Sequence, residues 1–161
     1  MSERTPAAGA LADHAAFEAD GGGFSVATTA FEARVSVRDT DERAAYHVGM
    51  RVPSIDSAVA GETVAPVVQE GWLETFELRL EDVGGVTSLA VSAPSVSLDR
   101  AAGEVVVEAV VPADPPHVAA DDAKAVVDYV EGTYAEGIIP GYTYREPVSG
   151  LIERARSAGE R

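Results

Sequence analysis

The sequence contains no cysteine, which excludes both disulfide bonds and thiolate metal sites. Lysine is almost absent as well, because Lys124 is the only lysine among 12 basic residues, against 27 Asp and Glu. The formal net charge is −15. Binding a polyanion requires clustered Lys and Arg, and a field of this sign repels it, so we expect no nucleic-acid partner.

Long hydrophobic runs are also missing. The longest uncharged stretch, residues 83–98, is interrupted by Gly84, Gly85, Pro94 and several serines. It is too broken to span a bilayer, so we expect no membrane association. The N-terminal residues lack the apolar core of a signal peptide, and a cytoplasmic location is therefore expected.

What the 161 residues do contain is enough apolar material for a packed core, since 46% of them are hydrophobic. We expect a single α+β domain over residues 1–161, with loose termini at 1–5 and 158–161. The acidic, lysine-poor composition resembles that of proteins from salt-loving archaea. At molar salt the Debye length is about 3 Å, so repulsion between surface carboxylates is screened. The sequence therefore predicts a fold that weakens when salt is removed.

Helical periodicity is clearest over residues 121–144. Apolar residues recur there at helical spacing as Ala123, Val127, Val130 and Tyr134, and Gly137 is expected to end the helix in a left-handed conformation. A second helix is expected from Thr63, as N-cap, to Leu80. Two shorter helices are predicted, one from Pro6 to the glycines at 21–23 and one over residues 150–157.

The helix after Thr63 should carry two faces. A broad apolar surface includes Val67, Trp72 and Phe76, and four glutamates line the opposite side. These glutamates are Glu70, Glu74, Glu77 and Glu81. They form a solvated face or, as the alternative, a site for a divalent cation or a basic partner. Trp72 and Tyr134 are predicted to be core residues.

Alternating residues predict strands at 24–26, 31–37, 45–51, 87–93, 96–98 and 105–111, with a break near residues 28–30. A loop at 39–42 pairs Val35 with Tyr46, Ala33 with Val48 and Phe31 with Met50, and it sets Arg34 opposite His47. A loop at 100–103 pairs Leu98 with Val105 and Val96 with Val107. The whole pattern favours one antiparallel sheet of about five strands packed against helices.

This order of elements, together with a long helix that runs into Gly-Ile-Ile-Pro-Gly-Tyr at residues 137–142, resembles the YbjN-like family, which shares its architecture with type III secretion chaperones. The full sequence also resembles a group of small haloarchaeal proteins. The resemblance to the YbjN-like family implies binding of a protein partner, often as a dimer, and a regulatory role. It brings no catalytic motif with it.

No motif for catalysis, metal or cofactor binding emerges from the sequence. His14, His47 and His117 lie on three separate predicted elements without the spacing of a metal pair. The glycines at 21–23 precede a strand, whereas a phosphate-binding loop opens a helix. We therefore name no catalytic residue, no metal ligand and no cofactor.

Five residues are candidates for a contact surface. Tyr142, Tyr144 and Arg145 follow the Pro-Gly turn, and aromatic residues and arginine are favoured at interfaces. Val106 and Val110 lie on the face of their strand opposite Val105 and Val107, which indicates that this strand is covered on both sides or lies at a subunit contact.

Two functions remain open at this point. The first is a non-enzymatic protein-binding or regulatory domain that forms a homodimer. The alternative is a small-ligand or metal-dependent enzyme whose site is assembled by folding from dispersed carboxylates and histidine.

Overall fold

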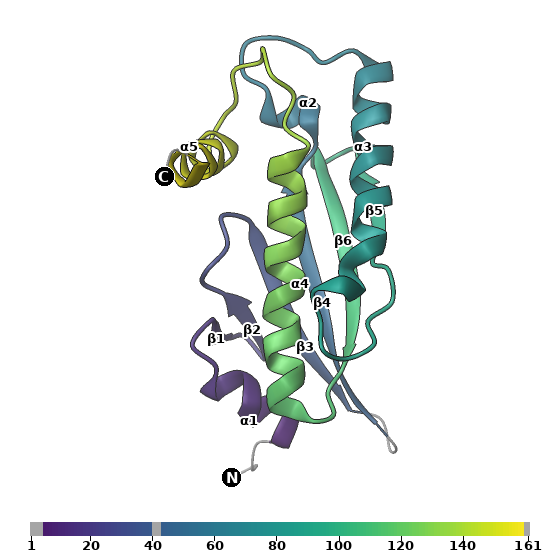
Figure 1. Ribbon diagram of the computed structural model, residues 1–161, viewed down its shortest axis with the longest axis vertical. Helices are drawn as coiled ribbons and strands as arrows, with labels where there is room; N and C mark the ends of the chain where they lie inside the picture. The colour runs from purple at the N-terminus through teal and green to yellow at the C-terminus, as the bar shows by residue number, and fades with distance from the viewer. Residues whose placement is uncertain (1–4, 40–42, 160–161) are drawn as a thin grey trace.

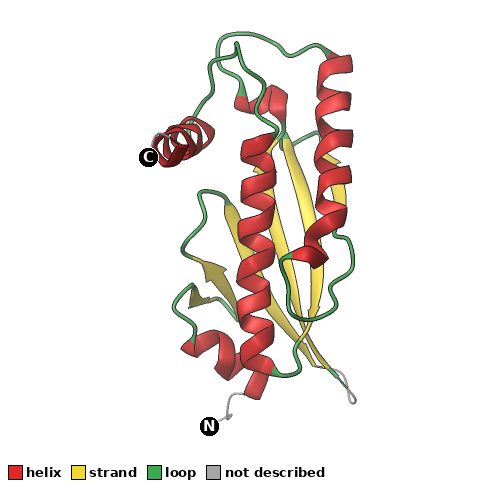
Figure 2. Cartoon of the chain, in the orientation of Figure 1, coloured by secondary structure: helices red, strands yellow, loops and turns green. Residues whose placement is uncertain are grey.

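A six-stranded antiparallel sheet forms the centre of the protein, and the helices lie against one of its faces (Figure 1, Figure 2). The computed structural model describes residues 5–39 and 43–159. The strands are β1 (Phe17–Asp20), β2 (Gly23–Val26), β3 (Glu32–Asp39), β4 (Ala44–Pro53), β5 (Ser95–Asp99) and β6 (Glu104–Pro112). The helices are α1 (Pro6–Asp13), α2 (Ile55–Ala58), α3 (Pro66–Leu80), the 3-10 helix η1 (Glu81–Gly85), α4 (Pro116–Glu136) and α5 (Val148–Gly159).

The strand order is β1-β2-β3-β4-β6-β5, so β1 and β5 are the two edges. This confirms the α+β class and the antiparallel sheet, with six strands instead of about five. No helix in the described ranges is long and apolar enough to cross a membrane.

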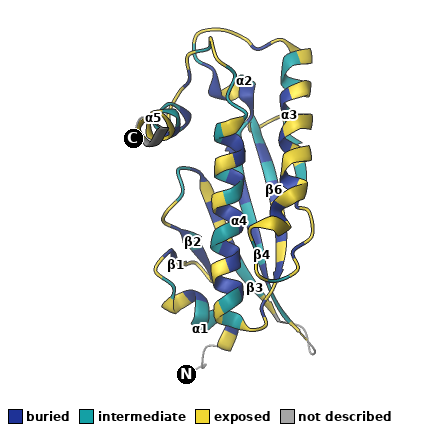
Figure 3. Cartoon of the chain, viewed as in Figure 1, coloured by how far each residue is buried: buried dark blue, intermediate teal, exposed yellow. Residues whose placement is uncertain are grey.

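Alternation along β4 and β6 builds the buried face of the sheet. Every second residue of β4 is buried from Tyr46 to Val52, and β6 repeats the pattern from Val105 to Val111. The helix α4 lies across this face, and the residues of its apolar stripe are buried as predicted (Figure 3).

An aromatic cluster joins α3 to α4. The rings of Trp72 and Phe76 stack with centroids 5.5 Å apart, and Tyr134 meets Trp72 edge-on at 5.5 Å. Trp72 is 6% exposed and Tyr134 is fully buried, which confirms that both are core residues.

The register of the β3–β4 hairpin differs from the prediction by two residues. Val37 pairs with Tyr46, Val35 with Val48 and Ala33 with Met50. The side-chain period of a strand is two, so a slip of two keeps the same residues on the buried face, and the apolar pattern alone cannot detect it. His47 consequently pairs with Ser36 and not with Arg34. Part of the turn, residues 40–42, lies outside the described residues.

The second hairpin has the predicted register, with Leu98 opposite Val105 and Val96 opposite Val107. Its turn contains Gly103, at φ +67°. The carbonyl oxygen of Gly103 accepts a hydrogen bond from the Ser54 N–H, 3.0 Å away, next to α2. This turn is therefore fixed to the helix that follows β4.

The first helix is shorter than predicted. Thr5 caps it as expected, since its Oγ1 accepts a hydrogen bond from the Ala8 N–H at 3.2 Å. The helix ends at Asp13, however, and Phe17–Asp20 forms the edge strand β1, which the sequence analysis missed. Gly21 and Gly22 make the turn between β1 and β2 instead of ending a helix. Four residues are too few for a period to distinguish helix from strand.

Two other helix boundaries were predicted wrongly. The helix α3 begins at Pro66 after Ala65, not after Thr63, and its apolar face is narrower than expected because Val67 is 74% exposed. The three glutamates of α3 and Glu81, which begins η1, are exposed as predicted. Gly137 ends α4 with φ −86°, a right-handed value, and the left-handed residue is Gly141 at φ +98°. The bond from the Gly137 N–H to the Thr133 oxygen explains this end, since it continues the helical pattern.

The predicted strand at residues 87–93 is a loop. The backbone N–H groups of Ser88 and Leu89 bond to the carboxylate of Asp122, both at 2.8 Å. These two donors are therefore satisfied by a side chain of α4, and the segment needs no neighbouring strand.

Candidate contact surface

The face of the sheet turned away from the helices is open. We call it the open face and define it by the outward-facing residues of β3, β4 and β6. They are Glu32, Arg34, Ser36, Arg38, Ala45, His47, Gly49, Arg51, Val106, Glu108 and Val110. The helices in the described part of the chain lie on the opposite side (Figure 2).

A cleft of about 700 Å³ lies on the open face. Its walls come from β3, β4 and β6 and from the loop at residues 90–93. Gly49 lines the cleft, and a Cβ atom added there would meet no atom within 4 Å. The centre of the open face is therefore hollow because β4 carries a glycine at that position.

The loop beside the cleft is held by a buried carboxylate. Asp122 is 3% exposed, and its two oxygens accept the hydrogen bonds of Ser88 and Leu89. Helical spacing predicts that Asp121 and Asp122 both lie on the charged face of this helix, and this is wrong for Asp122. The only sequence signal was an acid next to the apolar stripe, which does not distinguish a buried partner from a solvated one.

Cations gather on the open face of this acidic protein. Arg34 donates from Nη1 to Oδ2 of Asp20 at 2.8 Å and from Nη2 to the Asp20 carbonyl at 2.6 Å. Arg38 is exposed, and it has no ion pair with any of the described residues. The two arginines give the cleft a cationic side in a chain of net charge −15.

The other end of the open face is electrically balanced. Arg51 donates from Nη1 to Asp99 at 3.3 Å and to Glu104 at 3.2 Å. The backbone N–H of Ala102 and, next, the Arg51 guanidinium lower the pKa of Asp99. The bonds to Asp99 and Glu104 in turn raise the pKa of Arg51. Both partners therefore stay charged over a wide pH range.

Val106 and Val110, two of the five predicted contact residues, belong to the open face. Val110 is 49% exposed and lines the cleft, whereas Val106 is half-buried between its neighbours Arg51 and Ser97. A half-exposed valine beside guanidinium groups is a composition found at protein interfaces.

The other three predicted residues lie near α2, in the segment that follows α4. Tyr144 is 9% exposed, and its hydroxyl donates to the Ile139 oxygen at 2.6 Å and accepts from the Ile139 N–H at 3.1 Å. Burial raises the pKa of Tyr144. Tyr142 packs edge-on against it, and Arg145 is exposed. The cleft that contains Val110 includes none of these three residues, so the structure does not bring the two groups together there.

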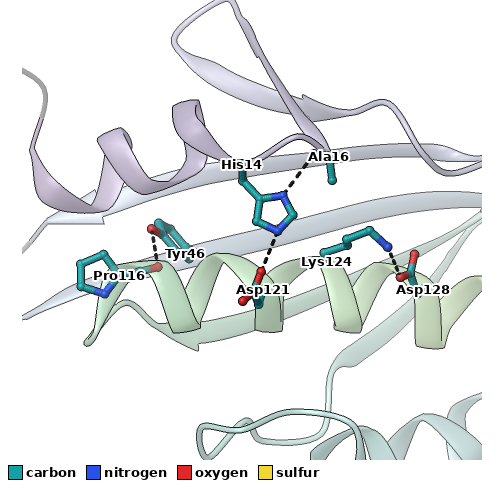
Figure 4. Close-up of polar contacts among 7 residues, drawn as sticks. All are labelled: His14, Ala16, Tyr46, Pro116, Asp121, Lys124 and Asp128. Atoms are coloured by element: carbon teal, nitrogen blue, oxygen red, sulfur yellow. Dashed lines mark hydrogen bonds and ion pairs between the residues drawn. The ribbon is translucent and has the colours of Figure 1, made fainter.

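His14 connects α1 to α4 (Figure 4). Its Nε2 lies 2.8 Å from Oδ1 of Asp121, and its Nδ1 accepts the Ala16 N–H at 3.1 Å. The proton of neutral His14 must therefore sit on Nε2. The Asp121 side chain is 75% exposed, so this pair is a surface hydrogen bond that joins the end of α1 to α4.

Tyr46, near the same junction, is fully buried, and its hydroxyl donates to the Ala7 oxygen at 2.6 Å. Burial raises the pKa of Tyr46 to about 12. This bond anchors α1 on β4.

Within residues 5–39 and 43–159, no group of three or more His, Asp or Glu side chains is placed to hold a metal ion. His47 lies on the open face, and His117 is an exposed residue in the first turn of α4.

Comparison with known proteins gives a family but no characterised relative. Neither the curated proteins nor the solved structures contain a match to this chain. One family profile matches residues 12–154, which cover every strand and the helices from α2 to α4. The chain therefore belongs to DUF5813, a family of unknown function.

Proposed function

We propose that this protein is a non-enzymatic protein-binding domain and that the open face is its contact surface. The observation that carries the proposal is Val110, 49% exposed beside a cationic cleft on a sheet face that the described helices leave uncovered. A hydrophobic side chain in such a place loses favourable burial unless a partner covers it.

The surroundings of Val110 support a polypeptide as the occupant. Interfaces of proteins combine apolar residues with arginine, and a guanidinium group forms directed bonds with carboxylates and carbonyls. The rim of the cleft is also fixed, because Asp122 ties the loop at residues 88–89 to α4. A partner would thus meet a surface that is already ordered, and ordering costs on binding would be small.

The composition also bears on where the protein works and at what salt concentration. We infer a single cytoplasmic domain adapted to high salt, from the acidic, lysine-poor composition. The kinship with YbjN-like proteins and type III secretion chaperones stays a proposal that rests on the order of elements.

A second function is favoured by one observation. The cleft of about 700 Å³ has the size of a small-molecule site, and His47, Glu108 and Arg38 line it. A small anionic ligand, bound or converted there, is therefore the alternative.

The test compares two valine substitutions. Val110→Glu places a carboxylate on the open face, and Val67→Glu is the matched control because Val67 is 74% exposed on α3. The tagged wild-type chain and both variants serve as bait in an extract of the producing cells at molar KCl. Captured polypeptides are then identified by mass spectrometry.

A polypeptide retained by the wild type and by Val67→Glu, but lost with Val110→Glu, is the expected result. Equal retention by all three baits, or no polypeptide retained by any of them, contradicts the proposal. If no polypeptide is retained and a small metabolite co-purifies with the wild type and with Val67→Glu but not with Val110→Glu, the ligand-binding alternative takes its place.

A further inference from the structure

The charges of the open face are arranged asymmetrically about β4. Arg34 on β3 pairs with Gly49 on β4, and Gly49 pairs with Glu108 on β6. Paired residues point to the same side of a sheet, so these three form one row across the open face. Along this row lie the positive Arg34, then Gly49 without a side chain, and then the negative Glu108.

In one direction the neighbouring rows contain Ser36, His47 and Val110, and then Arg38, Ala45 and Pro112. In the other direction the row contains Glu32, Arg51 and Val106. From the central row to Arg38 the side of β3 is therefore cationic, whereas the side of β6 offers Glu108 and apolar residues. When a second copy of this face is rotated to face the first, the cationic side of one copy lies opposite Glu108 of the other.

We infer that a second copy of this chain binds face to face on the open face, related by a two-fold axis that runs parallel to β4. This rotation exchanges the β3 side with the β6 side and places Arg34 of one copy above Glu108 of the other. The pair forms twice, as in any two-fold interface. The inference rests on the proposed contact function and specifies its partner.

The hollow at Gly49 allows the close approach. Packed sheets lie about 10 Å apart, and side chains of both faces must fit between them. At the axis Gly49 meets its own counterpart, and the open space above its Cα leaves room there for side chains of the second copy. Val110 then lies above Ser36 of the other copy and is removed from water.

The cations near the axis do not oppose this arrangement. Arg51 would approach its own counterpart, but Asp99 and Glu104 already balance its charge at 3.3 and 3.2 Å. Arg34 uses two of its N–H groups on Asp20. A guanidinium group has five N–H donors, so donors remain for Glu108 of the second copy.

The size of the surface fits a modest dimer. Three strands spaced about 4.8 Å apart, each contributing about eight residues at 3.3 Å, give roughly 380 Å² of flat sheet. A standard interface buries about 800 Å² of accessible surface per partner, and a corrugated surface exceeds its flat projection. The dimer should therefore dissociate on dilution within a measurable range.

A charge exchange between two variants tests the arrangement. Glu108→Arg leaves a chain with two arginines in the row, and Arg34→Glu leaves one with two glutamates. Each variant repels its own copy, but an equimolar mixture restores both ion pairs in a heterodimer. Sedimentation equilibrium at molar KCl measures the wild type, the two variants and the mixture over a range of concentrations.

The expected result is a wild-type dimer, a rise in Kd of about tenfold or more for each single variant, and recovery in the mixture. Because Arg34 also binds Asp20, thermal melting checks that Arg34→Glu folds. If Arg34→Glu does not fold, Gly49→Phe in the otherwise wild-type chain replaces it, because a Cβ atom at position 49 meets open space. Gly49→Phe should abolish the dimer. A dimer that is unaffected by this substitution contradicts the inference.

Two results overturn the inference. One is a wild-type chain that stays monomeric at every concentration, and the other is a mixture of folded variants that associates no better than either variant alone. A monomer that still captures a different polypeptide through Val110 leaves the proposed function intact, so the two failures are distinguishable.

Discussion

Asp122 shows how this chain buries a carboxylate without depriving it of partners. Its oxygens accept two backbone N–H bonds at 2.8 Å, and the helix α4 holds it against the loop at residues 88–89. Hydrogen bonds to a charged acceptor are stronger than neutral ones, and removing the acceptor leaves two donors unpaired.

The first prediction follows from this contact. Asp122→Ala should lower the free energy of unfolding by about 2–3 kcal/mol, the usual loss for buried bonds to a charged group. Chemical denaturation at molar KCl measures it. Asp121→Ala is the control, and it should lose less because Asp121 is 75% exposed. Equal losses for the two neighbours would contradict the role of Asp122.

The buried tyrosines predict the response to alkaline pH. Burial raises the pKa of Tyr46 from 10.0 to about 12 and raises the pKa of Tyr134 as well. The unfolded chain therefore releases these protons at lower pH than the folded chain does. Their contribution to stability is complete below about pH 10. It is lost as the pH rises towards the folded values.

Thermal melting between neutral and strongly alkaline pH checks this second prediction. The melting temperature should fall steeply above about pH 10. In Tyr46→Phe the fall should be shallower, although the variant starts from lower stability because it lacks the bond to Ala7. A wild-type melting temperature that does not change across this range would contradict the burial of these hydroxyls.

At the scale of elements, glycines mark where the backbone is constrained. Gly103 in the β5–β6 turn has φ +67°, and a Cβ atom there would clash with Oγ of Ser57. Gly61 has φ +81° with open space, and Gly49 has open space without a positive φ. Gly103 thus combines a steric clash with a left-handed backbone, Gly61 has only the left-handed backbone, and Gly49 has neither.

The third prediction is an order among alanine substitutions. Gly103→Ala should cost the most, more than the 1–3 kcal/mol typical of a strained backbone alone. Gly61→Ala should cost about 1 kcal/mol for the left-handed conformation. Gly49→Ala should be neutral or stabilising, because alanine restricts the unfolded chain. Chemical denaturation ranks them, and a neutral Gly103→Ala would show that the turn does not rest on α2.

The sequence predicts the elements in which a hydrophobic period extends over many residues. It does not predict features that depend on contacts between residues far apart in the sequence. Five of the six strands and the apolar stripe of α4 follow from alternation and helical spacing. The β3–β4 register does not, because a slip of two residues leaves every apolar residue on the buried face. The strand predicted at 87–93 fails because the bonds from Asp122 lie 33 and 34 residues away.

The candidate site is less predictable than the fold. The pattern of valines indicates an outward face for Val106 and Val110. The cleft, however, depends on the row formed by Arg34, Gly49 and Glu108, and residues this far apart in sequence meet only once the strand order is known. Nothing local to Gly49 distinguishes it from an ordinary glycine.

At the scale of the whole molecule, the net charge predicts how stability should depend on salt. The 27 acidic residues outnumber the 12 basic ones, and the exposed glutamates of α3 are part of this excess. Repulsion among surface carboxylates extends over a Debye length of about 10 Å at 0.1 M salt and about 3 Å at 1 M. Removing salt should therefore destabilise the folded chain more than the expanded one.

The fourth prediction is a melting temperature that falls as KCl is diluted from molar to millimolar concentration, followed by circular dichroism. Exchanging four glutamates of α3 and the start of η1 for glutamine should reduce this dependence, since it removes four exposed charges from one side of the molecule. These are Glu70, Glu74, Glu77 and Glu81. The same melting temperature at both salt concentrations would contradict the account of the acidic surface.

The most direct test of the open face as the contact between two copies of the chain uses the absence of cysteine. A single Gly49→Cys substitution provides the only thiol of the chain, at the centre of the open face, where its side chain meets no atom. Gly71→Cys on α3, also in open space, is the control. With a short bis-maleimide reagent at molar KCl, position 49 should give a cross-linked dimer and position 71 should not. Equal yields from the two positions, or cross-linking at 71 alone, would contradict the account.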